Sequence, residues 1–162
     1  MNLVYLSLGS NVGDKILQIE RAYTLLGEEG EVVKRSSFYK SDPWGFSSSN
    51  FFVNSCVEWR TLLSPIQCLK FVKQIEVELG RQLKDRAGYD DRTIDIDIIM
   101  FNELIISTPE LTIPHPYYSE RNFVLVPLQE IAPKLEDPIS KVIVSTMKDK
   151  CRDIGQVHKI FA

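Results

Sequence analysis

The chain has 162 residues, of which 44% are hydrophobic and 25% are charged, which is typical of one soluble globular domain, here over residues 1–162. Its formal net charge of −3 gives no general attraction to nucleic acid or anionic membrane, so phosphate binding would need a local basic cluster. No apolar run reaches about 18 residues, and the N-terminus lacks a charged region with a cleavage site. The three cysteines show no metal-ligand spacing, which favours free thiols in a reducing compartment. We therefore expect a cytoplasmic protein without a membrane or nucleic-acid partner.

Strand and helix signals alternate in the first half of the chain. An apolar strand over residues 3–8 ends at Gly9-Ser10-Asn11, and a helix follows over about residues 14–26. Two further strands are predicted over residues 31–39 and 51–60, with a serine-rich loop between them at residues 40–50. Ser64 and Pro65 then open a second helix, which Gly80 closes.

The second half begins with a charged loop over residues 81–91 and a buried strand around Asp95. A hairpin turn at residues 102–103 leads into a short strand over residues 104–107, and residues 112–116 are expected to be irregular. Helices are predicted near residues 119–126 and 140–150, and residues 157–161 as an edge strand or a frayed tail. The early order β-α-β-β-α-β is that of an α+β ferredoxin-like plait, a mostly antiparallel sheet with helices on its faces. The two long loops are expected to be mobile and to border the active site.

Two aspartates share one face of the buried strand. Period-two alternation gives one face Ile94, Ile96, Ile98 and Met100, and gives the other Thr93, Asp95, Asp97, Ile99 and Phe101. Carboxylates are costly to keep near a core, and Mg²⁺ between them would keep both ionised. The alternative interpretation is that both aspartates face solvent on a half-exposed antiparallel sheet.

Cationic side chains occur near this aspartate pair in the sequence. Arg92 comes three residues before Asp95, where a cation and Mg²⁺ can share a polyphosphate. The other cations are Lys73, Arg81, Lys84 and Arg86. A solvated charged loop is the alternative, because acidic residues partly offset them. Glu76 lies at the edge of a helical apolar stripe, from which it either reaches the sheet near the aspartates or extends along the surface.

Aromatic and amide side chains on the third strand suggest a flat ligand. Phe52 and Asn54 share one face of that strand, and a ring next to an amide can stack on and hydrogen-bond a heteroaromatic molecule. Trp44 in the serine-rich loop and Tyr89 in the charged loop can cover its other face, although the core explains each aromatic residue taken alone. His115 lies between two prolines, so its backbone is stiff, and both a functional and a structural role stay open.

Several of these motifs follow one another in a recognisable order. They are Gly9-Ser10-Asn11, Asn54, Gly80-Arg81, Arg92-Thr93-Ile94-Asp95-Ile96-Asp97, Pro114-His115 and Arg121-Asn122-Phe123. With them the chain resembles the 6-hydroxymethyl-7,8-dihydropterin pyrophosphokinase family of folate biosynthesis over about residues 3–131. The resemblance implies a cytosolic, monomeric ferredoxin-like enzyme, and we expect it to be monofunctional because the sequence shows no aldolase or synthase domain beside it. Such an enzyme moves the pyrophosphoryl group of ATP to the pterin hydroxymethyl oxygen and releases AMP.

The resemblance also implies roles for individual positions. Asp95 and Asp97 would bind two Mg²⁺ ions and, with Arg81 and Arg92, form the catalytic group. The implied pterin-binding residues are Ser41, Asp42, Trp44, Phe52, Asn54 and Phe123. The implied ATP-binding residues are Lys73, Glu76, Arg81, Lys84, Arg86, Arg92, Ile98, Thr112, His115 and Arg121. The charged loop departs from the family pattern, because Leu83 stands where the family has an arginine and Tyr89 where a tryptophan is common.

Two other classes of protein fit parts of the pattern. A glycosyltransferase also uses Asp-x-Asp with a divalent metal, but this chain is short for a sugar-nucleotide domain, and Phe52 and Asn54 would be unexplained. A non-catalytic nucleotide-sensing module would bind ATP without turnover and would need no pterin-shaped pocket. Formation of AMP from ATP in the presence of Mg²⁺ and the reduced hydroxymethylpterin distinguishes the three.

Overall fold

The computed structural model describes residues 1–43, 50–80 and 93–161. Within them lies an antiparallel sheet with the strand order β5-β1-β4-β3-β8, and β2 also pairs with β4. The strands are β1 (Asn2–Ser10), β2 (Gly30–Arg35), β3 (Tyr39–Ser41), β4 (Phe52–Thr61), β5 (Asp95–Phe101), β6 (Ile106–Ser107), β7 (Thr112–Ile113) and β8 (Val157–Lys159). The α-helices are α1 (Lys15–Leu26), α2 (Pro65–Glu78), α3 (Asn122–Ile131) and α4 (Val144–Lys150).

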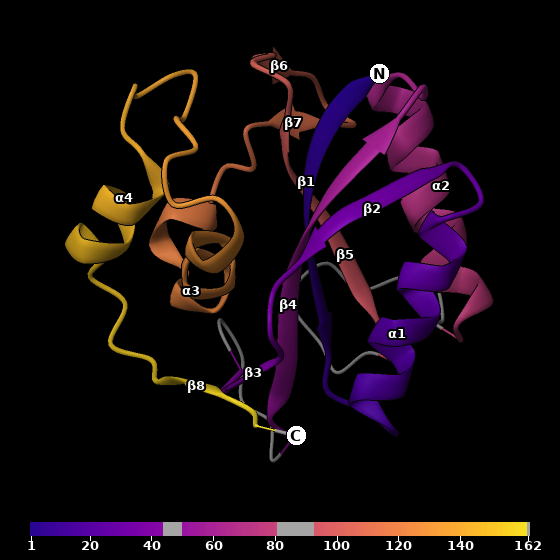
Figure 1. Cartoon of the computed structure of the whole chain (residues 1–162), viewed down its shortest axis with the longest axis horizontal. Coiled ribbons are helices and arrows are strands. Elements are labelled where there is room, and N and C mark those ends of the chain that lie inside the picture. The colour runs from indigo at the N-terminus through magenta and orange to yellow at the C-terminus, as the bar shows by residue number, and fades with distance from the viewer. Residues whose placement is uncertain (44–49, 81–92, 162) are drawn as a thin grey trace.

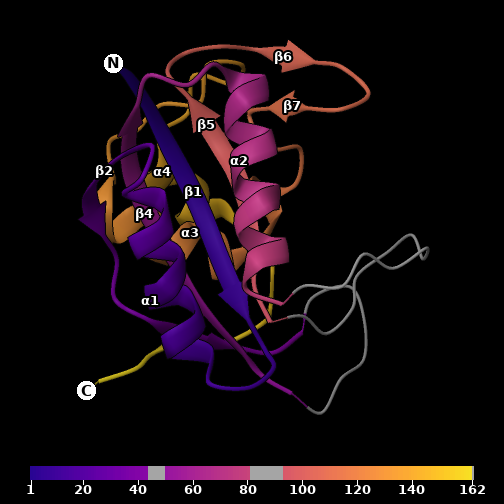
Figure 2. The same ribbon diagram turned by 90° about the vertical axis from the view of Figure 1, so that its right-hand side faces the viewer.

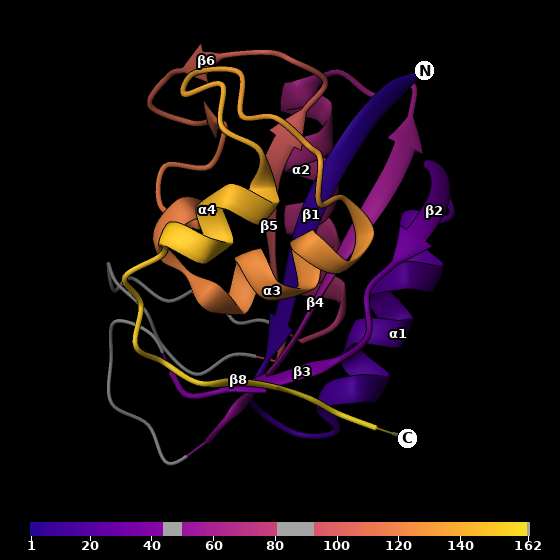
Figure 3. The same ribbon diagram turned by 60° about the vertical axis from the view of Figure 1, so that its left-hand side comes forward.

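The sheet separates two helical layers. Helices α1 and α2 cover one face and α3 and α4 cover the other (Figure 1). Figure 2 views the molecule from the α1–α2 side, and Figure 3 brings α3, α4 and β8 forward. This arrangement confirms the α+β expectation of a largely antiparallel sheet with helices on its faces.

Within the described ranges, no helix is long and apolar enough to cross a membrane.

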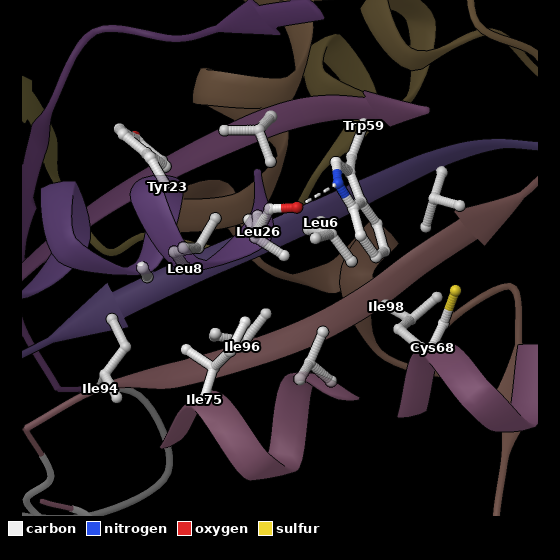
Figure 4. Packing of buried hydrophobic residues seen from close by; sticks show 14 of the residues in the cluster. Leu6, Leu8, Tyr23, Leu26, Trp59, Cys68, Ile75, Ile94, Ile96 and Ile98 are labelled. Carbon is white, nitrogen blue, oxygen red and sulfur yellow. Dashed lines mark hydrogen bonds between the residues drawn. The ribbon is translucent and has the colours of Figure 1, made fainter. Parts of the chain in front are cut away.

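Each face of the sheet has its own hydrophobic cluster. Leu6, Leu8 and Trp59 belong to the cluster under α1 and α2, where the Trp59 indole Nε1 donates a hydrogen bond to the Leu26 carbonyl at 3.1 Å (Figure 4). Tyr5 belongs to the cluster under α3 and α4. Successive side chains of one strand thus face opposite layers, as period-two alternation predicts.

The helix starts follow from local capping chemistry. The Asp14 side chain accepts a hydrogen bond from Leu17 N at 3.2 Å, which begins α1. Ser64 and Gln67 form a reciprocal capping box at the start of α2, with Pro65 at the first position. Gly80 has a φ of +99° just after α2, a conformation that favours glycine at a helix end. Both predicted starts are confirmed.

Several predicted boundaries are wrong, and for the strands the reason is that long-range pairing overrides the local pattern. The strand expected over residues 31–39 is two strands, β2 and β3, and both pair with β4. Residues 112–113, expected to be irregular, form β7 and pair with β6. The helix expected near residues 119–126 is a short 3₁₀ turn, Tyr118–Glu120, followed by α3, and α4 begins at Val144 instead of Ser140. The edge strand near the C-terminus is confirmed as β8.

A β-bulge interrupts the predicted alternation of β5. Leu6 pairs with Ile98 and Tyr5 with Met100, so Ile99 is an extra residue on β5. As a result Met100 packs in the α3–α4 cluster, and Phe101 packs in the α1–α2 cluster. The predictions that Met100 shares a face with Ile94, Ile96 and Ile98, and that Phe101 shares a face with the two aspartates, are therefore both wrong.

Candidate active site

Strand register places the sequence-predicted side chains in rows across the α3–α4 face of the sheet. On β1, Gly9 pairs with Asn54 on one side and with Asp95 on the other. Ser7 likewise pairs with Asp97 on β5. Cross-strand partners share a face, and strands two apart in a sheet are separated by roughly 10 Å. Two small residues on β1 therefore form a floor between the aspartates and Asn54.

The two aspartates form the electrostatic centre of this face. Burial and the neighbouring Asp95 carboxylate raise the pKa of Asp97 to about 7, although Lys73 and Arg121 act to lower it. The Asp97 side chain is 28% exposed, so a ligand can still reach it. Among the described residues no group of three or more His, Cys, Asp or Glu side chains gathers as a metal site. The two carboxylates nevertheless suit Mg²⁺, which takes one or two protein carboxylates and completes its shell with water and phosphate.

Glu76 fixes the strand between the two aspartates. Its side chain is 1% exposed, and Oε2 accepts a hydrogen bond from the Ile96 N–H at 2.8 Å. Lys73 Nζ lies 3.2 Å from Glu76 Oε1. The interpretation that Glu76 reaches the sheet is thus confirmed, and the alternative of a surface glutamate is wrong. The contact holds the outer edge of β5 where Asp95 and Asp97 project.

His115 is held against the bulge of β5. Its backbone N–H donates to the carbonyl of Ile99 at 2.9 Å, and its Nδ1 accepts from the Tyr117 N–H at 3.1 Å. A ring that accepts at Nδ1 carries its proton on Nε2 when neutral, and Nε2 lies 4.0 Å from Asp97 Oδ2. Burial and the charge of Arg121 lower the pKa of His115 to about 4. At neutral pH the ring is therefore an uncharged N–H donor beside the aspartates.

Asn54 and its neighbours form a second part of the site. Asn54 is 2% exposed, and its Nδ2 donates to Ser41 Oγ at 2.7 Å and to the Tyr39 carbonyl at 3.4 Å. A Cβ atom on Gly9 would lie 3.2 Å from Asn54 Oδ1 and 3.6 Å from a ring carbon of Phe52. Because glycine has no Cβ atom, position 9 leaves room for the side chains of Asn54 and Phe52.

Helix α3 contributes a cation and a ring to the opposite wall. Arg121, immediately before α3, is 3% exposed, and its guanidinium carbon lies 5.7 Å from the ring centre of Phe123. The same carbon lies 5.4 Å from the ring centre of Tyr117. Sequence reasoning missed Tyr117, for which proximity to His115 was the only signal. A positive charge on Arg121 lowers the pKa of both Asp97 and His115, so it acts directly on the aspartate centre.

The remaining predicted residues are placed less centrally. Asp42 is exposed just after β3, and Thr112 is exposed on β7. Thr112 and His115 also line one wall of a cleft of about 840 Å³, whose other walls include α4. Ile98 belongs to the α1–α2 cluster (Figure 4) and lies on the face of β5 opposite the aspartates. Outside the described residues lie Trp44, Arg81, Lys84, Arg86, Tyr89 and Arg92, together with most of the two long loops.

A family model and several known proteins are similar to this chain in sequence. Residues 5–133 match the family model described as 7,8-dihydro-6-hydroxymethylpterin-pyrophosphokinase. The chain is 43% identical over 137 residues to the 2-amino-4-hydroxy-6-hydroxymethyldihydropteridine pyrophosphokinase of Bacillus subtilis (strain 168). This match covers 83% of this chain and 81% of the relative. The corresponding protein of Aquifex aeolicus (strain VF5) is 42% identical, with 86% of each chain covered.

Longer proteins also contain a similar region. The folic acid synthesis protein FOL1 of Dictyostelium discoideum is 41% identical over 98% of this chain, which spans only 24% of that relative. A solved Plasmodium falciparum HPPK-DHPS structure is similar in fold, with a TM-score of 0.74 and 16% identity over 92% of this chain and 44% of the solved one. With 129 of its residues (5–133) matched by the family model, this chain belongs to the 7,8-dihydro-6-hydroxymethylpterin-pyrophosphokinase family.

Proposed function

We infer that this protein is a pyrophosphokinase of folate synthesis. It transfers the pyrophosphoryl group of ATP to the hydroxymethyl group of 6-hydroxymethyl-7,8-dihydropterin and releases AMP. The observation that carries this inference is the Asp95–Asp97 centre, which shares one sheet face with Asn54 in a chain of this family. Charge-neutralising groups and a slot for a flat polar ring are the two features that the reaction needs.

We propose that the pterin lies between Phe52 of the sheet and Phe123 of α3. Two rings stacked on one flat ligand contribute about 0.5–1.5 kcal/mol each beyond the area they bury. Asn54 Oδ1 would accept from the pterin edge, because its Nδ2 is already directed to Ser41. Asp42 and Trp44 are proposed to complete the slot from the loop after β3.

ATP is proposed to lie beside β5, with its phosphates facing the aspartate centre. Mg²⁺, two ions in our proposal, would be held by Asp95 and Asp97 and would neutralise phosphate charge. Arg121 stabilises negative charge, and His115 donates a hydrogen bond from its neutral Nε2. Glu76 keeps β5 in place, and Lys73 lies near it. The other proposed ATP ligands are Arg81, Lys84, Arg86, Arg92 and Thr112; Ile98 is not among them, because its side chain is buried under α1 and α2.

This arrangement requires alignment more than a strong base. Pyrophosphoryl transfer depends mainly on holding the attacking oxygen in line and on stabilising charge on the phosphates. The floor formed by Ser7 and Gly9 connects the two proposed subsites, so a pterin stacked on Phe52 would direct its substituent toward the aspartates. The sheet order with α1 and α2 on one face supports a ferredoxin-like plait. We propose that the protein acts as a cytoplasmic monomer.

Product analysis tests the function directly. The protein is incubated with ATP, Mg²⁺ and 6-hydroxymethyl-7,8-dihydropterin, and the nucleotide products are separated. Formation of AMP that depends on the pterin supports pyrophosphoryl transfer. A nucleotide-sensing module would bind ATP without forming AMP, and a glycosyltransferase would form no AMP without a sugar nucleotide. Absence of pterin-dependent AMP would therefore exclude the proposed reaction.

A further inference from the structure

The first turn of α3 is capped by a residue from far along the chain. Arg121, at the N-cap position, makes no side-chain cap hydrogen bond. Instead the Asn122 N–H donates to Asp153 Oδ2 at 2.9 Å, and Asn122 Nδ2 donates to the Asp153 carbonyl at 2.9 Å. The other carboxylate oxygen accepts from the Gly155 N–H at 2.8 Å. Asp153 therefore supplies an anionic cap at the positive end of the helix dipole.

Residues 151–159, here called the C-terminal strap, connect this cap to the edge of the sheet. The strap leaves α4, passes the start of α3 and reaches β3 (Figure 3). There β8 pairs with β3, and Val157 lies opposite Ser41. The strap thus contacts the helix that carries Phe123 and also the strand that carries Ser41. It lies beyond residue 133, where the match to the family model ends.

A second contact fixes the other end of α3 to the same edge. Glu130, near the end of α3, accepts hydrogen bonds from the Ser37 N–H at 2.8 Å, from the Ser37 hydroxyl at 3.1 Å and from the Tyr39 hydroxyl at 2.5 Å. Tyr39 is the residue whose carbonyl accepts from Asn54. With both ends attached, the tilt of α3 over the sheet is determined by contacts outside the helix itself.

We propose that Asp153 is a positioning residue for pterin binding. By capping α3 from the strap, Asp153 fixes the position of Phe123 relative to Phe52. This position determines the width of the slot between helix and sheet. The inference rests on the proposed pterin slot. It adds a residue that touches no substrate and acts through Phe123.

A double-mutant cycle tests whether Asp153 acts through Phe123. Asp153→Asn, Phe123→Ala and the double variant are compared by calorimetric titration with the pterin in the presence of Mg²⁺ and a non-hydrolysable ATP analogue. Asp153→Asn removes the negative charge at the positive end of the helix dipole and leaves one acceptor oxygen for two N–H groups, so it should weaken pterin binding about fivefold to tenfold. In the Phe123→Ala protein the same change should have less than about a twofold effect. Equal losses in both backgrounds, or no loss in either, would overturn the proposal.

Two further variants separate positioning from general stability. Asp149→Asn removes the same charge from an exposed position on α4 and should leave pterin binding unchanged; a matching loss there would assign the effect to charge alone. If Asp153→Asn does not fold, Asn122→Ala takes its place in the cycle: it keeps the backbone bond to Asp153 Oδ2 but removes the side-chain bond that ties α3 to the strap, and a loss of at least about twofold that disappears in the Phe123→Ala background is then expected. Failure of the proposed function would look different, because Phe123→Ala alone would then leave pterin binding unchanged.

Discussion

At the scale of single residues, Asp97 combines an unfavourable environment with a central position. Its carboxylate is held near Asp95, where burial and like charge raise its pKa to about 7. Such a position stabilises the fold less than a neutral side chain of the same shape would. In the proposed function this carboxylate binds a cation, which would offset that cost.

We therefore predict that Asp97→Asn separates activity from stability. The substitution keeps the shape and removes one charge, so turnover should fall by about 100-fold or more, as expected when a transition-state charge contact is lost. Thermal unfolding at neutral pH without Mg²⁺ should occur at the same or a higher temperature than in the wild type. Near-normal Mg²⁺-dependent turnover by this variant would rule out the metal-binding role.

Gly9 is predicted to act through the space it leaves empty. A Cβ atom there would lie 3.2 Å from Asn54 Oδ1, so Gly9→Ala should displace the amide by a few tenths of an ångström. We expect pterin affinity to fall by about tenfold, with ATP-analogue affinity within about twofold of the wild type, measured by titration calorimetry. In an Asn54→Ala background the same change should have little further effect, and a full effect there would show that the alanine disturbs β1 itself.

At the scale of elements, the contact between α3 and β3 should respond to acid. Burial acts to raise the pKa of Glu130, but the hydrogen bonds from Tyr39 and Ser37 outweigh it, so its pKa is lowered. A lowered carboxyl pKa stabilises the fold above the unfolded-state value of about 4.3. That stabilisation is lost as the pH falls through the lower, folded-state pKa.

Glu130→Gln is thus predicted to reduce the free energy of unfolding at pH 7 by no more than about 1 kcal/mol, because Glu130 is exposed and solvent screens its charge. The difference from the wild type should shrink below about pH 4. Urea unfolding at several pH values measures it. Glu78→Gln, at an exposed position on α2, is the control, and an equal pH-dependent loss there would contradict the assignment to the α3–β3 contact.

Local signals in the sequence predict the elements better than they predict the contacts between them. The caps at Asp14 and Ser64 lie within a few residues of the helices they begin, so the helix starts follow directly. Period-two alternation also brings Asp95 and Asp97 to one face. The spacing role of Gly9 depends on which strands are neighbours, and the bulge at Ile99 depends on register with β1. Neither of these two features can be predicted from a local sequence pattern.

At the scale of the whole molecule, the proposed pterin slot joins two layers. Phe52 belongs to the sheet and Phe123 to the helical layer over it, so a ligand between them should hold the layers together. A ligand that binds only the folded protein stabilises it by about 2.7 kcal/mol at a free concentration of 100 times its Kd. We expect a pterin-dependent rise in Tm in the presence of an ATP analogue and Mg²⁺.

Phe123→Ala should abolish most of that rise and leave the shift caused by the ATP analogue alone. Differential scanning calorimetry measures both shifts. If Phe123→Ala keeps the full pterin-dependent rise, the slot does not span the two layers, and the pterin binds on the sheet alone.

The bulge at Ile99 makes the length of β5 as important as its composition. Strand β5 supplies Phe101 to the α1–α2 cluster and Met100 to the α3–α4 cluster. This is because the extra residue, Ile99, shifts the alternation of side chains between the two faces by one position after Ile98. Deletion of Ile99 would remove the extra residue, so Met100 and Phe101 would follow Ile98 in regular alternation and keep their layers, but the carbonyl that holds His115 would be lost. We therefore expect this deletion to disturb the position of His115 beside Asp97 more than the packing of the two hydrophobic layers.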